Sequence, residues 1–427
     1  MTIKKNIIFV LIEKLYIFVI GFYLLTLVSN HLGSHLYGVY SFSISIILLA
    51  MAFARLGLNQ LVINYLVHFS NNIDSILLNT FVLKLFVGIV MGIITYIFLS
   101  YKIEDYNANI VSLVLVFYAF EVFEFWIQSL RKNYIVSILN MLTITIISIL
   151  TYLAVKTNAK LELFLVIYVL SATLKYILLG FYYFSKGNYF FNNYSKVKLN
   201  FLFNKTKPLF LASIFTASFM QIDQIMIEMI LGINSVGIYS LAVNVNNYVF
   251  AIPMTFFAII LPYLSKYKKD YNFMIFNNLF IVTTSILFYI LFSLAIFLYL
   301  FSDIIFNLLF TSDFNASIEI YNILLIALPI VGINLSFYNY FVLIKRNDIN
   351  LKATFIALLS NIILNYILLR IYGPIGAAYA SVLSYYILVF LLYSFIFYKS
   401  KNIFYIVFPF FYKDIYKESI ELIRKDF

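Results

Sequence analysis

The segment LGSHLYGVYS spans residues 32–41, and a related segment, LGINSVGIYS, spans residues 231–240. Leu, Gly, Gly, Tyr and Ser recur at identical spacing in the two segments. Each segment follows the first long apolar stretch of one half of the chain and runs into the second. We therefore predict an internal repeat, in which the first glycine of each copy ends a helix and the second lets the next helix pack closely.

The composition excludes a soluble globular protein. Of the 427 residues, 64% are apolar and 11% are charged, whereas soluble domains average about 45–50% and about 25%. A disordered chain is excluded as well, since such chains are poor in aromatic residues and 20% of this one is aromatic. The class that remains is a polytopic helical membrane protein. Cysteine is absent and the three histidines alone cannot build a metal centre, so we expect neither a cofactor nor a metal.

Twelve apolar stretches are long enough to cross a bilayer as helices, which takes about 20 residues each. Twelve spans leave too little chain for a folded soluble domain between them, and none has the alternating pattern of a membrane barrel strand. The predicted spans are 6–29, 37–58, 76–100, 109–128, 134–155, 161–184, 208–231, 236–263, 273–300, 318–343, 351–370 and 375–398.

The basic residues predict the orientation of these spans. If the N-terminus is cytoplasmic, 21 of the 29 Lys and Arg residues fall on inner segments and four fall on outer ones. This asymmetry follows the positive-inside rule, so we expect both termini in the cytoplasm. The net charge of +11 is then a topology signal, and it does not predict nucleic acid as a partner.

The longest inner connection divides the chain into two halves of six spans. Both halves then begin on the same side of the membrane, so the repeats are parallel. We predict an all-α membrane protein with two parallel six-helix lobes. The expected limits are 1–185 for the N-terminal lobe, 186–207 for a cytoplasmic linker, 208–398 for the C-terminal lobe and 399–427 for a cytoplasmic tail. Apolar residues at helical spacing in 412–427 predict an amphipathic helix on the inner leaflet; the alternative is a solvated basic tail.

Three segments carry a resemblance to a known family. They are the turn after the first span, the stretch QIDQIMIEMILGINSVGIYSLA at 221–242, and the stretch NIILNYILLRIYGPIGAAYASVLSYY at 361–386. The most specific part is the run Tyr372-Gly373-Pro374-Ile375-Gly376-Ala377-Ala378. Together these segments resemble polysaccharide flippases of the O-antigen, Wzx type. Those proteins belong to the larger superfamily of multidrug, oligosaccharidyl-lipid and polysaccharide exporters.

The resemblance implies a MATE-like fold, a V-shaped pair of six-helix lobes. It also implies a bacterial cytoplasmic membrane protein that moves an undecaprenyl-pyrophosphate-linked oligosaccharide from the inner to the outer leaflet. Such a substrate is an O-antigen-type or capsule-type repeat, and the surrounding membrane lipids are a second partner. A polysaccharide polymerase and chain-length proteins are candidate partners that the resemblance adds.

Four basic residues fall inside the predicted spans, in the cytoplasmic half of the bilayer. A charged side chain at the centre of a spanning helix costs roughly 2.5–3.5 kcal/mol of insertion free energy. One interpretation is a cationic, substrate-binding cavity that offsets the desolvation of a pyrophosphate. The alternatives are snorkelling of long side chains to the interface and structural ion pairs. The four candidate residues are Lys14, Arg55, Lys84 and Lys175.

Several carboxylates also fall inside predicted spans. Asp223 is the main candidate for coupling transport to an ion gradient, since a buried carboxylate can bind and release a proton as access alternates. The alternative is a helix–helix hydrogen bond or ion pair, and Glu228 lies close enough to the outer end to be interfacial. Glu121 and Glu124 share one helix face, and they are ion-coupling candidates or neutralisers of the lysines.

Two other functions stay open. A multidrug or cation exporter of the same superfamily would line its cleft with acidic residues. The four basic residues inside the spans argue against such an exporter. A membrane polysaccharide polymerase or ligase would need a large outer loop with arginines or a His/Asp constellation, and the longest outer connection, 301–317, has no Lys, Arg or His. We therefore expect a transporter and not an enzyme. A lipid II flippase is expected to carry two further helices, for which this chain lacks room.

Overall fold

A computed structural model describes residues 3–68, 73–103, 106–187, 196–270 and 273–397. Over these ranges the chain is helical and contains no strand, as the composition predicts. The predicted amphipathic helix at 412–427 and residues 188–195 of the predicted linker lie outside the described ranges.

Within the described residues, the predicted spans fall on helices, except that the span 37–58 also includes the turn at 56–57 between α1 and α2. The α-helices are α1 (Ile3–Arg55), α2 (Leu58–His68), α3 (Ile73–Lys102), α4 (Leu113–Phe117), α5 (Val122–Ser129), α6 (Asn133–Lys156), α7 (Leu161–Ser185), α8 (Lys196–Leu231), α9 (Ile233–Asp270), α10 (Phe273–Leu309), α11 (Asn315–Leu343), α12 (Asn347–Tyr372) and α13 (Pro374–Phe397). Short 3-10 turns are η3 (Ala108–Ser112), η4 (Tyr118–Glu121) and η5 (Ser312–Phe314). The predicted span 109–128 is built from η3, α4, η4 and α5 in succession.

Within the described residues, ten helical stretches are long and apolar enough to cross a membrane. One of them lies on α1, which contains the first predicted span and most of the second, up to Arg55, and departs from helical geometry at Gly33. The predicted span 236–263 lies on α9, which is not among the ten. The protein is thus a multi-pass helical membrane protein.

The chain forms two compact units, Met1–Ser240 and Leu241–Phe427. In the first unit α8 packs against α1 and α3, so it groups with the helices of the first half of the sequence. This division comes later in the chain than the predicted linker at 186–207, because it follows packing and not the sequence repeat. The lobe limits expected from the repeat therefore stay a prediction.

An aromatic cluster fixes the short helix α5 against α7 in the first unit. The ring of Tyr183 lies 5.0 Å from that of Phe123 and 4.9 Å from that of Trp126, measured between centroids. Gly180 makes this approach possible, since an added Cβ would lie 3.1 Å from the Phe123 ring. Such aromatic pairs stabilise a fold beyond the area that they bury. Glu124 lies between two members of this cluster in the sequence of α5, Phe123 and Trp126.

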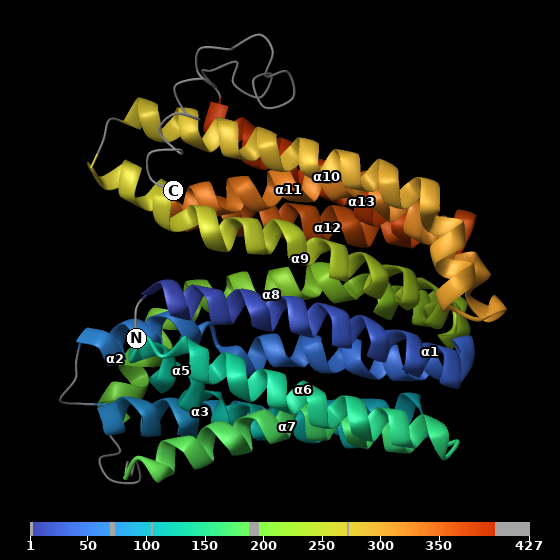
Figure 1. The fold of residues 1–427 in the computed structure, drawn as a ribbon, viewed down its shortest axis with the longest axis horizontal. Helices are drawn as coiled ribbons and strands as arrows, with labels where there is room; N and C mark the ends of the chain where they lie inside the picture. Colours follow the sequence, from blue (N-terminus) through green and yellow to red (C-terminus); the bar gives the residue numbers. More distant parts are fainter. Residues whose placement is uncertain (1–2, 69–72, 104–105, 188–195, 271–272, 398–427) are drawn as a thin grey trace. The chain divides into compact units, whose positions relative to one another are not determined.

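The second unit is a bundle in which α10, α11, α12 and α13 run side by side (Figure 1). Its tightest turn is the glycine-rich motif between α12 and α13. Gly373 has φ 61° and ψ −145°, a conformation open essentially to glycine alone, and Pro374 is the first residue of α13. A Cβ on Gly376 would overlap the carbonyl of Leu368. The motif thus joins two closely packed antiparallel helices.

The repeated segments meet each other within the first unit. Gly33 and Gly232, the first glycines of the two copies, both have positive φ, at 67° and 87°. A Cβ on Gly38 would overlap the carbonyl of Ile233, and a Cβ on Gly237 would overlap the carbonyl of Ser34. The predicted roles of both glycine pairs are confirmed.

Candidate functional site

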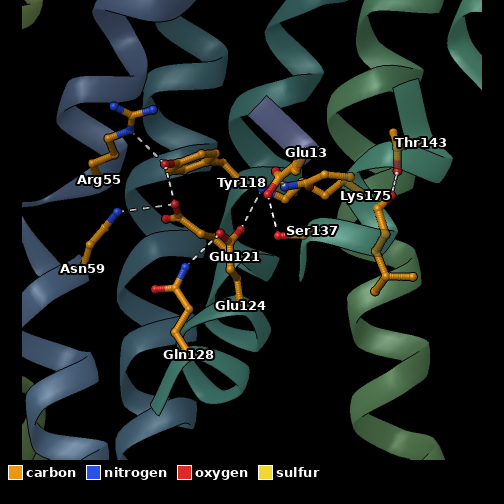
Figure 2. Close-up of polar contacts among 12 residues, drawn as sticks. Glu13, Arg55, Asn59, Tyr118, Glu121, Glu124, Gln128, Ser137, Thr143 and Lys175 are labelled. Carbon is orange, nitrogen blue, oxygen red and sulfur yellow. Dashed lines mark hydrogen bonds and ion pairs between the residues drawn. The ribbon is translucent and has the colours of Figure 1, made fainter. Parts of the chain in front are cut away.

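A chain of polar contacts links the end of α1 to η4 (Figure 2). The Arg55 Nε donates a hydrogen bond to the hydroxyl of Tyr118 at 2.8 Å, and that hydroxyl donates to Glu121 Oε1 at 2.8 Å. Asn59 Nδ2 lies 3.4 Å from the same carboxylate oxygen. The guanidinium of Arg55 also lies 5.7 Å from the centre of the Tyr118 ring. Tyr118 therefore connects the charges of Arg55 and Glu121.

Lys84 forms the buried end of this network. Its amine pairs with Glu121 Oε2, and its side chain has no exposed surface. The amine also lies 4.4 Å from the centre of the Tyr118 ring and 5.0 Å from that of Phe125. A cation in such a site is neutralised by its partner carboxylate and shielded by aromatic rings. The structure therefore does not bring Lys84 to a surface where a ligand could reach it.

Lys175 lies at the border of the network. Its amine is 2.7 Å from Glu124 Oε2, and one quarter of its side chain is exposed. Glu124 Oε1 accepts a second hydrogen bond, at 3.0 Å, from Gln128 Nε2. Figure 2 shows the side chain of Glu124, which comes from α5, and that of Lys175, which comes from α7. Lys175 thus keeps part of its surface available while its charge is balanced.

Glu13 is buried without an ion pair among the described residues. Its side chain is on α1, and 5% of the residue is exposed. Ser137 Oγ donates to Glu13 Oε2 and Asn140 Nδ2 donates to Glu13 Oε1, each at 2.6 Å. A further hydrogen bond, 2.7 Å between Tyr16 and Thr145, joins α1 to α6. Two neutral donors on α6 therefore hold the carboxylate in place.

A cavity of about 430 Å³ lies among α1, α6 and α7. This volume is within the range of roughly 300–1,000 Å³ that small-molecule sites occupy. We call it the polar cavity, because its lining combines apolar residues with a set of polar ones. The polar lining residues are Glu13, Lys14, Tyr40, Asn140, Thr143, Thr151, Tyr168, Ser171 and Lys175.

The structure divides the four predicted cations into two pairs. Lys14 and Lys175 both line the polar cavity, and Lys14 has no ion-pair partner within the described ranges. Arg55 and Lys84 instead contact Tyr118, outside the lining of that cavity. Sequence reasoning missed Glu13 as a cavity residue. Its position next to Lys14 gave no signal for this role, since neighbouring helix residues point about 100° apart.

The four carboxylates predicted for ion coupling all have partners. Glu121 and Glu124 are paired with lysines as described above. Glu228 lies 3.1 Å from Lys102, and the predicted orientation would place both residues near the outer side. Asp223 accepts a hydrogen bond of 2.7 Å from the hydroxyl of Tyr239, and both residues are buried. Asp223 thus has a helix–helix hydrogen bond, the alternative that the sequence left open.

Two protein-family models match parts of this chain. The model of the polysaccharide biosynthesis protein family matches residues 3–268. The chain belongs to this family. The MatE family model matches residues 208–367 of this polysaccharide biosynthesis protein. A search of curated protein sequences gave no match.

Solved structures with the same fold are transporters of the exporter superfamily that the sequence resembles. The lipid II flippase MurJ in an inward closed conformation has a TM-score of 0.69 and 17% identity, with 98% of this chain and 99% of that chain covered. An inward-facing multidrug resistance MATE family transporter has a TM-score of 0.73 and 14% identity, over 90% and 93%. A MOP superfamily transporter from Pyrococcus furiosus has a TM-score of 0.66 and 13% identity, over 92% and 94%.

These likenesses confirm the predicted MATE-like fold. They also correct one expectation. The match spans nearly the whole of the lipid II flippase, so lack of room for further helices does not separate this chain from that protein.

Proposed function

We propose that this protein moves a lipid-linked oligosaccharide from the inner to the outer leaflet of a bacterial cytoplasmic membrane, by alternating access and with both termini in the cytoplasm. Membership of the polysaccharide biosynthesis protein family supports a saccharide as cargo. The similarity of the fold to a lipid II flippase supports a lipid-linked form of that cargo. The substrate that we propose is an undecaprenyl-pyrophosphate-linked repeat of the O-antigen or capsule type.

The observation that carries the proposal is the pairing of Lys14 with Lys175 at one polar cavity. A pyrophosphate loses its hydration when it leaves water, and fixed ammonium groups offset that loss. Lys14 offers an uncompensated charge, and Lys175 offers an amine that can be shared between Glu124 and a phosphate. In this proposal Lys14 and Lys175 bind substrate, whereas Arg55 and Lys84 stabilise the neighbouring network.

The lining gives less support to a multidrug or cation exporter than to a carrier of an anionic group. Two ammonium groups and one carboxylate, that of Glu13, line the polar cavity, and Glu124 outside the lining balances Lys175. Lys14 pairs with no described carboxylate, so its ammonium group would repel a cationic guest and attract an anionic one. A membrane polymerase or ligase has less support, since the structural neighbours reported above are transporters.

For energy coupling we retain Asp223 as the candidate residue. It is buried, and the hydroxyl of Tyr239 donates one hydrogen bond to it. Glu121, Glu124 and Glu228 are weaker candidates, because each already neutralises a lysine. A polysaccharide polymerase and chain-length proteins would use the product on the outer face, and they remain proposed partners.

A gene deletion with complementation tests the proposal. We expect the deletion strain to accumulate undecaprenyl-linked saccharide on the inner leaflet and to lose surface polysaccharide, and the intact gene to restore both. Complementation with Lys14→Gln should be weak. Lys156→Gln is the matched control, because Lys156 is an exposed lysine at the C-terminal end of α6, and it should complement fully. A deletion strain that keeps its surface polysaccharide and accumulates no lipid-linked saccharide would contradict the proposal.

A further inference from the structure

The carboxylate of Glu13, which lines the polar cavity, uses only half of its capacity to accept hydrogen bonds. An ionised carboxylate can accept about four hydrogen bonds. Glu13 accepts two, one on each oxygen, from Ser137 and Asn140. Both donors are neutral, and no described cation pairs with Glu13. The remaining acceptor capacity belongs to a residue that lines the cavity.

Burial makes that spare capacity significant. A buried carboxylate with few partners is costly, and further donors from a ligand would lower the cost. Ser137 and Asn140 also fix the carboxylate in one orientation, so that a ligand meets a preorganised acceptor. Asn140 lines the cavity beside Glu13 and adds an amide oxygen as a further acceptor.

Tyrosines form another part of the lining. Tyr40 and Tyr168 lie edge to face, with ring centres 6.4 Å apart, and both line the cavity. In the part of the chain that the structure describes, the hydroxyl of Tyr168 makes no hydrogen bond. It can therefore donate to or accept from a guest. Aromatic faces beside polar acceptors give a lining that is amphipathic, as a sugar ring is.

We infer that Glu13, Asn140 and Tyr168 form a subsite that binds the hydroxyl groups of a sugar in the transported headgroup. This inference rests on the proposed function, because it assigns the saccharide part of that substrate to these three lining residues of the polar cavity. Lys14 and Lys175 then hold the phosphates, and the neutral, donor-rich sugar meets the carboxylate. A carboxylate suits sugar hydroxyls, which are donors, and it repels phosphate. The two kinds of group thus orient the headgroup within one cavity.

Binding measurements on the full chain in lipid nanodiscs test the subsite. The probes are undecaprenyl pyrophosphate and four derivatives of it that carry N-acetylglucosamine, N-acetylgalactosamine, glucose or galactose. The readout is the ratio of the dissociation constants of the bare lipid and of the best sugar-bearing lipid. We expect the intact protein to prefer a sugar-bearing lipid and Glu13→Gln to lower this ratio about tenfold or more, with affinity for the bare lipid kept.

Matched variants separate the two parts of the cavity. Tyr168→Phe should lower the ratio in the same direction by a smaller factor, and it tests the subsite independently if Glu13→Gln fails to fold. Lys175→Gln should weaken all five lipids together and leave the ratio unchanged. Two variants are the controls. Glu162→Gln places the glutamate-to-glutamine substitution on an acidic residue of α7 outside the cavity lining, and Tyr152→Phe places the tyrosine-to-phenylalanine substitution on an exposed tyrosine.

The outcomes distinguish the inference from the function on which it rests. If the intact protein binds the lipids but prefers no sugar, or if Glu13→Gln and Tyr168→Phe leave the preference unchanged, the subsite is wrong and the flippase proposal stands. If the intact protein binds none of the five lipids, the proposed function fails, and the subsite fails with it.

Discussion

Gly38 and Gly237 hold equivalent positions in the two repeats, and a Cβ added to Gly38 or to Gly237 would lie 3.1 Å or 3.0 Å from the backbone nitrogen of the other glycine. The backbone around Ser34 closes on Gly237, and the backbone around Ile233 closes on Gly38. A hydrogen bond of 2.8 Å from Ser34 Oγ to Asn234 Oδ1 joins the same two segments. The repeat is therefore a contact between its own copies, and glycine is required on both sides of it.

Gly38→Ala and Gly237→Ala should each destabilise the folded protein by about 1–3 kcal/mol or more, because the added methyl group would overlap a backbone carbonyl that cannot move freely. Thermal unfolding of the purified protein in detergent measures the effect. Gly92→Ala is the matched control, since its Cβ would meet its nearest neighbour at an ordinary 3.5 Å. Equal melting temperatures for all three variants would contradict the reciprocal contact.

Lys84→Met should cost about 3–5 kcal/mol of stability, because it leaves the carboxylate of Glu121 buried without its cation. Lys84→Met combined with Glu121→Leu should recover much of that loss, since neither member of the buried pair is then charged. The same unfolding measurement compares the single and double variants. If the double variant loses more unfolding free energy than the two single variants lose together, the broken ion pair is not the reason for the loss.

Lys14→Gln and Lys175→Gln should differ in stability although both weaken transport. Lys14 has no described ion-pair partner, so its loss should leave the melting temperature nearly unchanged. Lys175 balances Glu124 at 2.7 Å, so its loss should also lower the melting temperature. The measurements are lipid-linked saccharide transport in proteoliposomes and thermal unfolding. Normal transport by Lys14→Gln would remove that residue from the substrate site.

Asp223→Asn should abolish the dependence of transport on an ion gradient. Tyr239→Phe, which removes the hydroxyl that donates to Asp223 at 2.7 Å and keeps the carboxylate, should retain it. Asparagine keeps the shape of the side chain and cannot exchange a proton. Transport in proteoliposomes with and without an imposed gradient tests this. Normal gradient-driven transport by Asp223→Asn would show that Asp223 is structural.

The spans, the repeat and the helical class could be predicted from sequence because they depend on local properties. Apolar length places each helix, and the paired glycines mark where the backbone turns or comes close. The assignment of charges to partners could not be predicted. Lys84 and Lys175 look alike in sequence, and only the packing of α5 against α3 and α7 buries the first fully and leaves the second partly exposed.

The polar cavity depends on packing to the same degree. Glu13 stands beside Lys14 in the sequence, yet Glu13 is buried against α6 while Lys14 is exposed. The donors that hold Glu13 are more than 100 residues away along the chain. Periodicity within α1 predicts that the two side chains diverge, but it does not predict what either of them meets.

The pair of Lys84 and Glu121 also constrains how the chain enters the bilayer during synthesis. The lysine emerges from the ribosome 37 residues before its carboxylate. Until that partner arrives, an isolated ammonium in the third predicted span costs roughly 2.5–3.5 kcal/mol on insertion scales. We expect this span to wait at the translocon and to leave it together with the following one, so that these two spans enter the bilayer as a pair.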